Sequence, residues 1–473
     1  MTPLNVLNEQ KPRQIAARVL GQRRTNGLFV EDLLEIALGN AQLSSADRGL
    51  CQEIVYGVIR WQAALDWLIA RKTGGREQKP ALQNLLRLGL YQIFWLDRIP
   101  PHAAVHETVE QTKRAGYHTQ AGLINAVLRA YLREFDEIKK ILADMKISQP
   151  ALGWSYPDWL VEKWRVNFGD EKMRQLLEWN NTPPKTFARA NALKFRSCRP
   201  VLRSPARGTE GGREEAPTKS AIGNPQSAMD LNDPGDLLIR WSEEGVEYDP
   251  ITRDWTGENL AFELKSHPPL NSLGSLRDGW FYIQDPSTLL APILLDPPPG
   301  ENILDMCAAP GGKTTFLAQL MNNKGKIIAA DISPDRLKLI RDNCARLGVN
   351  IVEPVLSAAF NLQPSTFNLV LIDAPCSNTG VMRRRVDLRW RITAEEILRL
   401  QKTQLDLLNQ AATKLKPGGT LIYSTCSLEP EENTEVVKQF LAAQPNFKLE
   451  TERQLLPFTD GVDGAYVAKL KSG

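Results

Sequence analysis

The spacing of apolar residues changes its period along the chain. Over residues 14–133, apolar positions recur at steps of three and four, as in ALQNLLRLGLYQIFWL, and this spacing is typical of amphipathic helices. Pro100 and Pro101 stand where one helix ends and the next begins. We therefore predict an all-α N-terminal domain over residues 1–140.

The last part of the chain shows a different pattern. Short apolar runs (NILDM, KIIAA, FNLVLID, TLIYST) alternate with helical stretches such as SPDRLKLIRDNCARLG. This alternation predicts a parallel, doubly wound α/β sheet over residues 276–473. Ligands of such sheets bind beyond the carboxyl ends of the strands, so the residues that follow each strand are the ones to inspect.

Between these parts, residues 150–275 combine helices with the predicted strand TFARANALKF, which indicates a helical linker and a small α+β domain. Residues 197–236 are rich in Gly, Pro, Ser and charge and poor in aromatics. That composition predicts a disordered insertion.

Composition excludes several classes of protein. With 473 residues, the chain has room for two or three domains. Its 58 Lys and Arg against 55 Asp and Glu give no global signature of nucleic-acid binding. We find no apolar run long enough for a bilayer and no signal-peptide pattern, so we expect a cytoplasmic protein with no membrane partner.

The cysteines, the histidines and the basic residues near the start of the chain give further local information. The 6 cysteines lack CxxC spacing and the 4 histidines do not cluster with them, so we expect no disulfide framework and no metal. The start of the helical part is basic, which fits either a solvated face or a site of RNA contact. Its basic residues are Lys11, Arg13, Arg18, Arg23 and Arg24.

The first two predicted strands end in features of a nucleoside site. DMCAAPGGKTT follows the first strand, and Gly311 and Gly312 let the backbone approach a ligand at a helix N-terminus. A Walker A loop would need glycine at Cys307, so a phosphate-binding NTPase is disfavoured. Asp331 ends the second strand and is suited either to ribose hydroxyls or to capping the next helix. Together the two predict a nucleoside-bearing cofactor.

Two cysteines follow later strands. Asp373 and Cys376 lie in IDAPCSNTG after the fourth strand, and Cys426 follows the fifth. We expect strands four and five to flank the first, which would bring both thiols to one site. A single cysteine is more often a small core residue, but two at functional strand ends favour chemistry. Cys51, Cys198 and Cys344 have no such context and are interpreted as structural or incidental.

Two thiols beside a nucleoside cofactor suggest a particular reaction. C5 of a pyrimidine becomes nucleophilic when a thiolate adds to C6, which is covalent catalysis. An acid such as Asp373 stabilises the adduct at N3, and a second cysteine assists release. Because a free thiol titrates near pH 8.5, the nucleophile needs a positive neighbour, for which Lys313 is the candidate.

These motifs resemble the RNA cytosine-C5 methyltransferases of the NOL1/NOP2/Sun family, and within it the RsmB branch. CAAPGGK, DAPCS, TCS, FYIQDPS and PEEN all match, and the helical start is similar to the NusB antitermination-factor fold. The resemblance implies a NusB-like domain, an RRM-like middle domain and a Rossmann-like methyltransferase domain. It implies S-adenosyl-L-methionine as cofactor, with Cys426 as nucleophile and Cys376 aiding release.

The resemblance also implies further site residues. The cofactor would be held by Cys307, Ala308, Ala309, Pro310, Gly311, Gly312, Lys313, Asp331 and Asp373. The family's RRHPD is RRRVD here, a basic patch suited to RNA phosphates. The expected RNA-binding residues are Arg383, Arg384, Arg385 and Arg389.

The chain departs from the family's pattern after strand three, and three functions are compatible with its motifs. The family carries an acid after strand three, where this chain has Ser357 and Ala358, and Glu353 is out of register. The leading hypothesis is methylation of cytosine C5 in 16S ribosomal RNA by a monomer. The alternatives are the same chemistry on another RNA such as tRNA, or a non-catalytic RNA-binding assembly factor.

Overall fold

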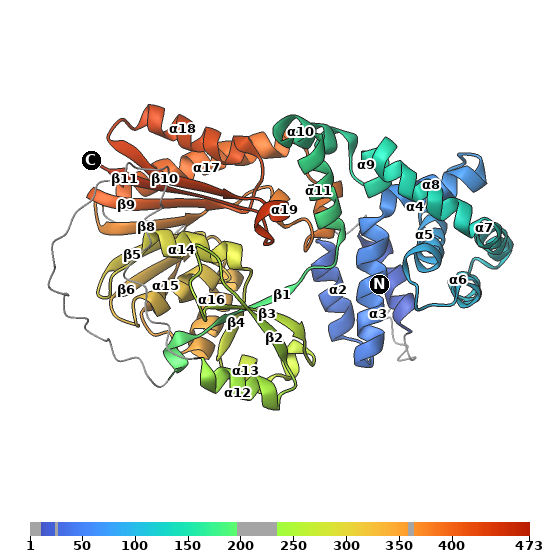
Figure 1. The fold of residues 1–473 in the computed structure, drawn as a ribbon, viewed down its shortest axis with the longest axis horizontal. Helices are drawn as coiled ribbons and strands as arrows, with labels where there is room; N and C mark the ends of the chain where they lie inside the picture. Colours follow the sequence, from blue (N-terminus) through green and yellow to red (C-terminus); the bar gives the residue numbers. More distant parts are fainter. Residues whose placement is uncertain (1–10, 24–26, 196–233, 358–363) are drawn as a thin grey trace, which may run out of the picture. The chain divides into compact units, whose positions relative to one another are not determined.

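The computed structural model describes residues 11–23, 27–195, 234–357 and 364–473, which form two compact units (Figure 1). Unit 1 comprises Met1–Pro184 and Val381–Thr393, and unit 2 comprises Lys185–Gly380 and Ala394–Gly473. Several positions discussed above lie outside the described residues: Arg24, Cys198, Ala358 and all of the predicted insertion except 234–236.

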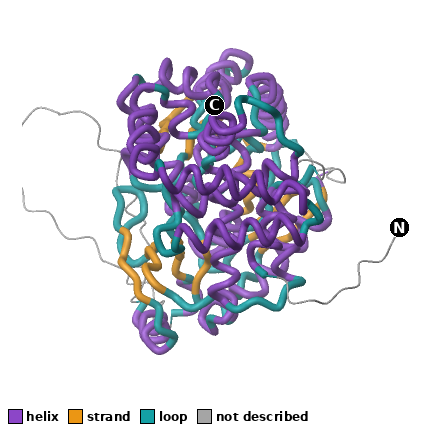
Figure 2. The backbone as a smooth tube through the Cα atoms, turned by 90° about the vertical axis from the view of Figure 1, so that its right-hand side faces the viewer, coloured by secondary structure: helices purple, strands orange, loops and turns teal. Residues whose placement is uncertain are grey.

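Unit 1 contains helices but no strand among its described residues (Figure 2). Its helices are α1 (Pro12–Gln22), α2 (Val30–Gly39), α3 (Ser45–Arg60), α4 (Gln62–Thr73), α5 (Pro80–Trp95), α6 (Pro101–Arg114), α7 (Ala121–Arg133), α8 (Phe135–Ser148), α9 (Pro150–Trp154), α10 (Asp158–Phe168) and α11 (Asp170–Asn181). The all-α prediction is confirmed, and Pro101 is the first residue of α6, where a missing N–H does no harm.

A four-stranded antiparallel sheet begins unit 2, in the order β2-β3-β1-β4. Its strands are β1 (Thr186–Ala190), β2 (Glu247–Ile251), β3 (Ala261–Ser266) and β4 (Phe281–Ile283), and it packs on α12 (Gly235–Glu243) through Trp241. The predicted boundary at 275/276 falls before β4, which pairs with β1. The small domain therefore reaches further along the chain than the sequence suggested.

The second sheet of unit 2 has seven strands in the order β10-β11-β9-β8-β5-β6-β7. They are β5 (Asn302–Met306), β6 (Lys326–Asp331), β7 (Val352–Leu356), β8 (Phe367–Asp373), β9 (Leu415–Thr425), β10 (Phe447–Leu455) and β11 (Ala465–Ser472). β5 to β9 are parallel, as predicted, but β11 is antiparallel to both β9 and β10. The sheet is thus mixed, and β10 and β11 were missed.

Helices cover both faces of this sheet (Figure 1). Adjacent residues of β5 point to opposite faces: Ile303 belongs to one apolar cluster and Leu304 to the other. The first face is covered by α14 (Leu290–Leu295), α15 (Gly312–Leu320) and α16 (Pro334–Leu347), and the second by α17 (Ala394–Lys414) and α18 (Thr434–Ala443). Short helices α13 (Gly274–Arg277) and α19 (Pro457–Asp460) complete the unit.

The strand order corrects one expectation. β8 lies between β5 and β9, so the fifth predicted strand pairs with the fourth and does not flank the first. The carboxyl ends of β8 and β9 are nevertheless neighbours, because Asp373 is in register with Ser424. The loops that carry Cys376 and Cys426 therefore leave the sheet side by side.

Candidate active site

The two predicted cysteines meet at the ends of β8 and β9. Their Sγ atoms are 3.3 Å apart, and the Cys426 thiol also lies 3.0 Å from Oδ1 of Asn378. The hydrogen bond to Cys426 and burial together raise the pKa of Cys376 well above that of a free thiol. The Cys376 thiol therefore holds its proton more tightly than a free thiol does, and the side chain of Cys426 is half-buried.

Backbone hydrogen bonds fix the two loops to each other. The N–H of Gly380 donates to the carbonyl of Cys426 at 2.9 Å, and the N–H of Gly464 donates to the carbonyl of Gly380 at 2.9 Å. A Cβ at position 380 would lie 2.7 Å from the Cys426 carbonyl oxygen and 2.8 Å from Cα of Gly464. The close approach of three chain segments therefore requires glycine at 380.

Gly380→Ala is expected to destabilise unit 2 by about 1–3 kcal/mol and to lower activity, because backbone atoms must move to admit the methyl group. Urea unfolding measures the loss. Gly122→Ala is the matched control, since its Cβ meets nothing within 4 Å in an exposed stretch of α7. Equal unfolding midpoints for Gly380→Ala and the parent protein would contradict the close packing described here.

A lysine–aspartate pair lies at the same edge of the sheet. Nζ of Lys313 is 2.7 Å from Oδ2 of Asp373, and the hydroxyl of Ser424 donates to Oδ1 of Asp373 at 3.0 Å. Burial alone would lower the pKa of Lys313, but the Asp373 carboxylate outweighs it and raises that pKa, with Cys426 adding to the rise. Lys313 thus stays protonated within electrostatic range of Cys426. Its activation of the Cys426 thiol stays a prediction.

The loop after β5 is folded against the end of β6. The N–H of Ala309 donates to Oδ2 of Asp331 at 3.1 Å, and Arg336 lies 3.6 Å from the other carboxylate oxygen. Gly311 has φ +98°, a left-handed conformation that favours glycine, and α15 starts at the next residue. The loop therefore presents a helix N-terminus beside an acid that is only 1% exposed.

Comparison with known proteins shows the family of the chain. Residues 292–471 match the family model of the 16S rRNA methyltransferase RsmB/F, residues 10–133 match the NusB family, and residues 156–198 match the RsmF/B-like ferredoxin-like domain. The probable ribosomal RNA small subunit methyltransferase B of Bacillus subtilis (strain 168) is 31% identical over 485 residues, which cover 97% of this chain and 98% of the relative. The chain belongs to the RsmB/F methyltransferase family.

A second curated relative agrees with this assignment, and a solved structure shares the fold. The ribosomal RNA small subunit methyltransferase B of Escherichia coli O1:K1 / APEC is 32% identical over 472 residues, covering 97% of this chain and 98% of the relative. The crystal structure of PH0851 covers 100% of both chains with a TM-score of 0.73 and 24% identity, which shows the shared fold. The predicted RsmB/F resemblance and the three-part fold class are thus confirmed.

The cofactor of the RsmB/F family is S-adenosylmethionine, and the residues of the loop fit it. Oδ1 of Asp305 is buried and has no hydrogen-bond partner among the described residues, while Thr314 donates to Oδ2 at 2.6 Å. The carboxylates of Asp331 and Asp373 lie at the end of the sheet, which suits a sulfonium cation and ribose hydroxyls. Cys307, whose pKa burial raises to about 12, is a neutral lining residue.

Asp305 also makes stability depend on pH. Burial raises its pKa to about 7, whereas an unfolded Asp titrates near pH 3.9. Between these values the folded state keeps a proton that the unfolded state has lost, so the free energy of unfolding falls as pH rises, on the order of 4 kcal/mol for this group. Asp305→Asn is expected to gain stability relative to the parent from pH 4 to pH 7. Urea unfolding across this range is the test, and parallel pH profiles would contradict it.

The arginine segment of the RsmB/F chain is placed differently from the prediction. Arg389 is 0% exposed, and its guanidinium donates to the carbonyl of Asn180 and to Oδ1 of Asn181 within unit 1. Arg383 is buried over the ring of Trp179 and donates to the carbonyl of Pro183. Their burial in unit 1 disfavours direct RNA contact by Arg383 and Arg389 in this conformation. The proposal remains for two residues: Arg384, half-buried, and Arg385, exposed.

The basic start of unit 1 is also partly used for internal contacts. Nε of Arg13 donates to Oε1 of Gln92 at 2.6 Å, and Arg23 pairs with Asp387 and donates to Gln62. The sequence left open whether the basic residues at this end contact RNA. The contacts of Arg13 and Arg23 favour a structural role for these two.

The departure after strand three is visible in the structure. Ser357 directly follows β7, and Glu353 lies inside that strand, where its carboxylate pairs with Lys326 at 2.7 Å. Glu353 therefore pairs with Lys326 and does not replace the family's acid after strand three, in agreement with its register.

Sequence reasoning missed two buried residues that support the site. Arg189 of β1 is fully buried and donates to the carbonyl of Gly312 at 2.7 Å and to Oγ1 of Thr315 at 3.1 Å, which joins the small sheet to the start of α15. Glu432 accepts hydrogen bonds from both cysteine loops. Nothing in the sequence around Arg189 indicates that it is buried. Glu432 lies in PEEN, which matches the family, but the motif does not indicate which groups the glutamate binds.

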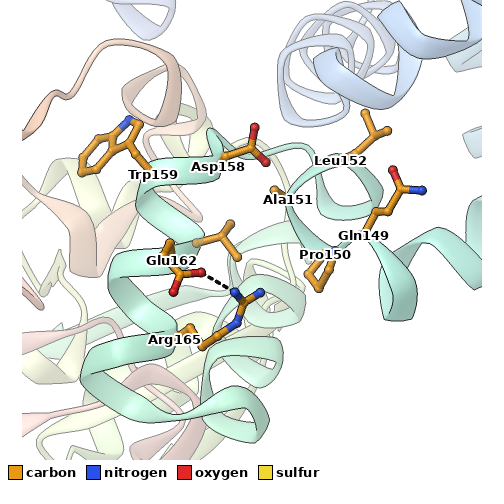
Figure 3. Close-up of a pocket in the computed structure, with 9 residues that line it drawn as sticks. Gln149, Pro150, Ala151, Leu152, Asp158, Trp159, Glu162 and Arg165 are labelled. Carbon is orange, nitrogen blue, oxygen red and sulfur yellow. Dashed lines mark hydrogen bonds and ion pairs between the residues drawn. The ribbon is translucent and has the colours of Figure 1, made fainter.

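Other features lie apart from this site. A hollow of about 530 Å³ lies in unit 1 between α9 and α10, and none of the predicted site residues lines it (Figure 3). Arg165 pairs with Glu162 at its edge. Within the described parts of the chain, no helix has the length and apolarity to cross a bilayer, and no His, Cys, Asp and Glu side chains gather in a group suited to a metal ion.

Proposed function

We propose that the protein transfers a methyl group to C5 of a cytosine in small-subunit ribosomal RNA, with Cys426 as the nucleophile. The observation that carries the proposal is the 3.3 Å separation of the Cys426 and Cys376 sulfur atoms beside the Lys313–Asp373 pair. A thiol pair and an acid at the mouth of a methyltransferase sheet match the needs of a C5 reaction, in which a nucleophile must add and then leave.

The residues of the chain take separate roles. The Cys426 thiolate forms a bond to C6, and the C5–C6 π electrons make C5 nucleophilic. Bound S-adenosylmethionine supplies an electrophilic methyl carbon. Asp373 takes a proton from the ammonium of Lys313 and donates it to N3 of the base as the C6–sulfur bond forms, which neutralises the charge that develops on the ring. After methylation, a water molecule takes the C5 proton, the electrons of that C–H bond restore the C5–C6 double bond, and the C6–sulfur bond breaks with its electron pair on Cys426. Cys376 lies next to the departing sulfur.

The target base has to leave its stack before Cys426 can reach C6. Single-stranded or splayed bases of RNA meet this requirement most easily. Small-subunit ribosomal RNA is proposed as the substrate because two relatives of nearly full coverage carry it in their names.

Methyl transfer from labelled cofactor to three RNAs tests the proposal: unmodified 16S rRNA, the same RNA in ribosomal particles, and total tRNA. The expected product after digestion to nucleosides is 5-methylcytidine from small-subunit RNA. Label in tRNA alone would support the alternative substrate. No label in any RNA, with retained RNA binding, would support the non-catalytic assembly factor.

A further inference from the structure

A buried glutamate lies beneath both cysteine loops. Glu432 ends the short 3-10 turn Pro430–Glu432 and is 0% exposed. Its Oε1 accepts from the N–H of Ser377 at 2.8 Å and from Nε2 of Gln404 at 3.1 Å. Its Oε2 accepts from the hydroxyls of Ser377 and Ser427. Both oxygens of one carboxylate are therefore engaged.

Each of the two serines that Glu432 holds is the neighbour of one of the two cysteines. Ser377 directly follows Cys376, and Ser427 directly follows Cys426. Their hydroxyl oxygens are 3.1 Å apart, close to the 3.3 Å that separates the two sulfurs. Because each serine is one peptide unit from its cysteine, a carboxylate that holds both serines also sets the separation of the thiols.

The rest of the network supports this arrangement. Gln404 of α17 donates to Glu432 and also to the carbonyl of Pro375 at 2.9 Å, the residue before Cys376. Burial raises the pKa of Glu432, and its hydrogen bonds to the serines oppose that rise. A buried carboxyl group is retained only where its hydrogen bonds are satisfied, as they are here.

We propose that Glu432 is a positioning residue, which holds Ser377 and Ser427 so that Cys376 stands next to Cys426 during release of the RNA adduct. This inference rests on the proposed function. It predicts that weakening the network slows release more than it slows formation of the C6–sulfur bond, because formation needs Cys426 alone whereas release needs both thiols at the correct spacing.

The test is Glu432→Gln in the full chain, with small-subunit ribosomal RNA and S-adenosylmethionine. The amide keeps the size of the side chain but turns one acceptor into a donor that faces hydrogen-bond donors. We expect turnover to fall roughly ten-fold and the fraction of protein in an SDS-resistant RNA adduct to rise several-fold. Glu435→Gln, the same change on an exposed residue of α18, is expected to leave both values unchanged.

Each outcome bears on the inference. Lower turnover without more adduct per folded protein, or unchanged behaviour, would overturn it, since a merely structural role lowers both in proportion to the folded fraction. If Glu432→Gln does not fold, the double variant Ser377→Ala and Ser427→Ala gives the same test with the same expected adduct rise. A Cys376→Ser variant that traps adduct while the Glu432 and serine variants do not would defeat this inference but leave the proposed function intact.

Discussion

Cys426→Ser is expected to reduce methyl transfer by more than about 1,000-fold, because a serine hydroxyl at neutral pH is a far weaker nucleophile than the thiolate that the proposed reaction requires. The change removes one sulfur from a pair 3.3 Å apart and leaves the Lys313–Asp373 pair in place. Binding of the cofactor is therefore expected to persist. Initial rates with labelled cofactor and calorimetric cofactor binding measure the two effects separately.

The matched control for this prediction is Cys344→Ser. Cys344 is a buried cysteine of α16 in the apolar cluster that covers one face of the sheet, and it has no contact with either site cysteine among the described interactions, so its loss is expected to change stability more than activity. Full activity in Cys426→Ser would remove Cys426 from the reaction. Loss of cofactor binding in the same variant would show that the mutation damages the fold of the site.

Cys376→Ser is expected to form the adduct but release it slowly, so that protein covalently joined to RNA accumulates. Cys376 is buried with a raised pKa and touches Cys426 directly, which places a protonated group beside the bond that must break. Denaturing gels of the reaction with labelled RNA show the adduct as a slower band. We expect the band to grow at least ten-fold over the parent protein.

The combined variant gives the control for this band. Cys376→Ser with Cys426→Ser lacks the nucleophile, so the band is expected to disappear. A band that persists in the double variant would place the bond on another residue. Absence of a band in Cys376→Ser alone, with normal turnover, would show that Cys376 has no part in release.

Much of the catalytic end of the sheet could be predicted from sequence, because each residue there directly follows an apolar strand. Asp331, Asp373 and Cys426 were located in this way, and the strands end where predicted. The antiparallel β10 and β11 were missed for a physical reason. β10 lies at the edge of the sheet and buries only its two end residues, Phe447 and Leu455, so FKLETERQL lacks a clear apolar alternation.

The residues that hold the site together could not be predicted, because their partners are distant in sequence. Arg389 appeared to belong to a basic surface, yet it is buried against Tyr156 and the end of α11 in unit 1. Glu432 was noted only as part of the PEEN family match, yet it is buried beneath two loops. The sequence shows that a residue is charged, but its burial and its partner are known only from the fold.

Ribosomal RNA made with 5-fluorocytidine gives the most direct test of the central claim, that Cys426 adds to cytosine C6. Fluorine at C5 cannot be removed as a proton is, so a methylated adduct stays bound to the protein. After nuclease and protease digestion, mass spectrometry identifies the modified peptide. The account predicts a methylated fluorocytidine on the peptide that contains Cys426. A modified Cys376 peptide, or active enzyme that forms no adduct with this RNA, would contradict it.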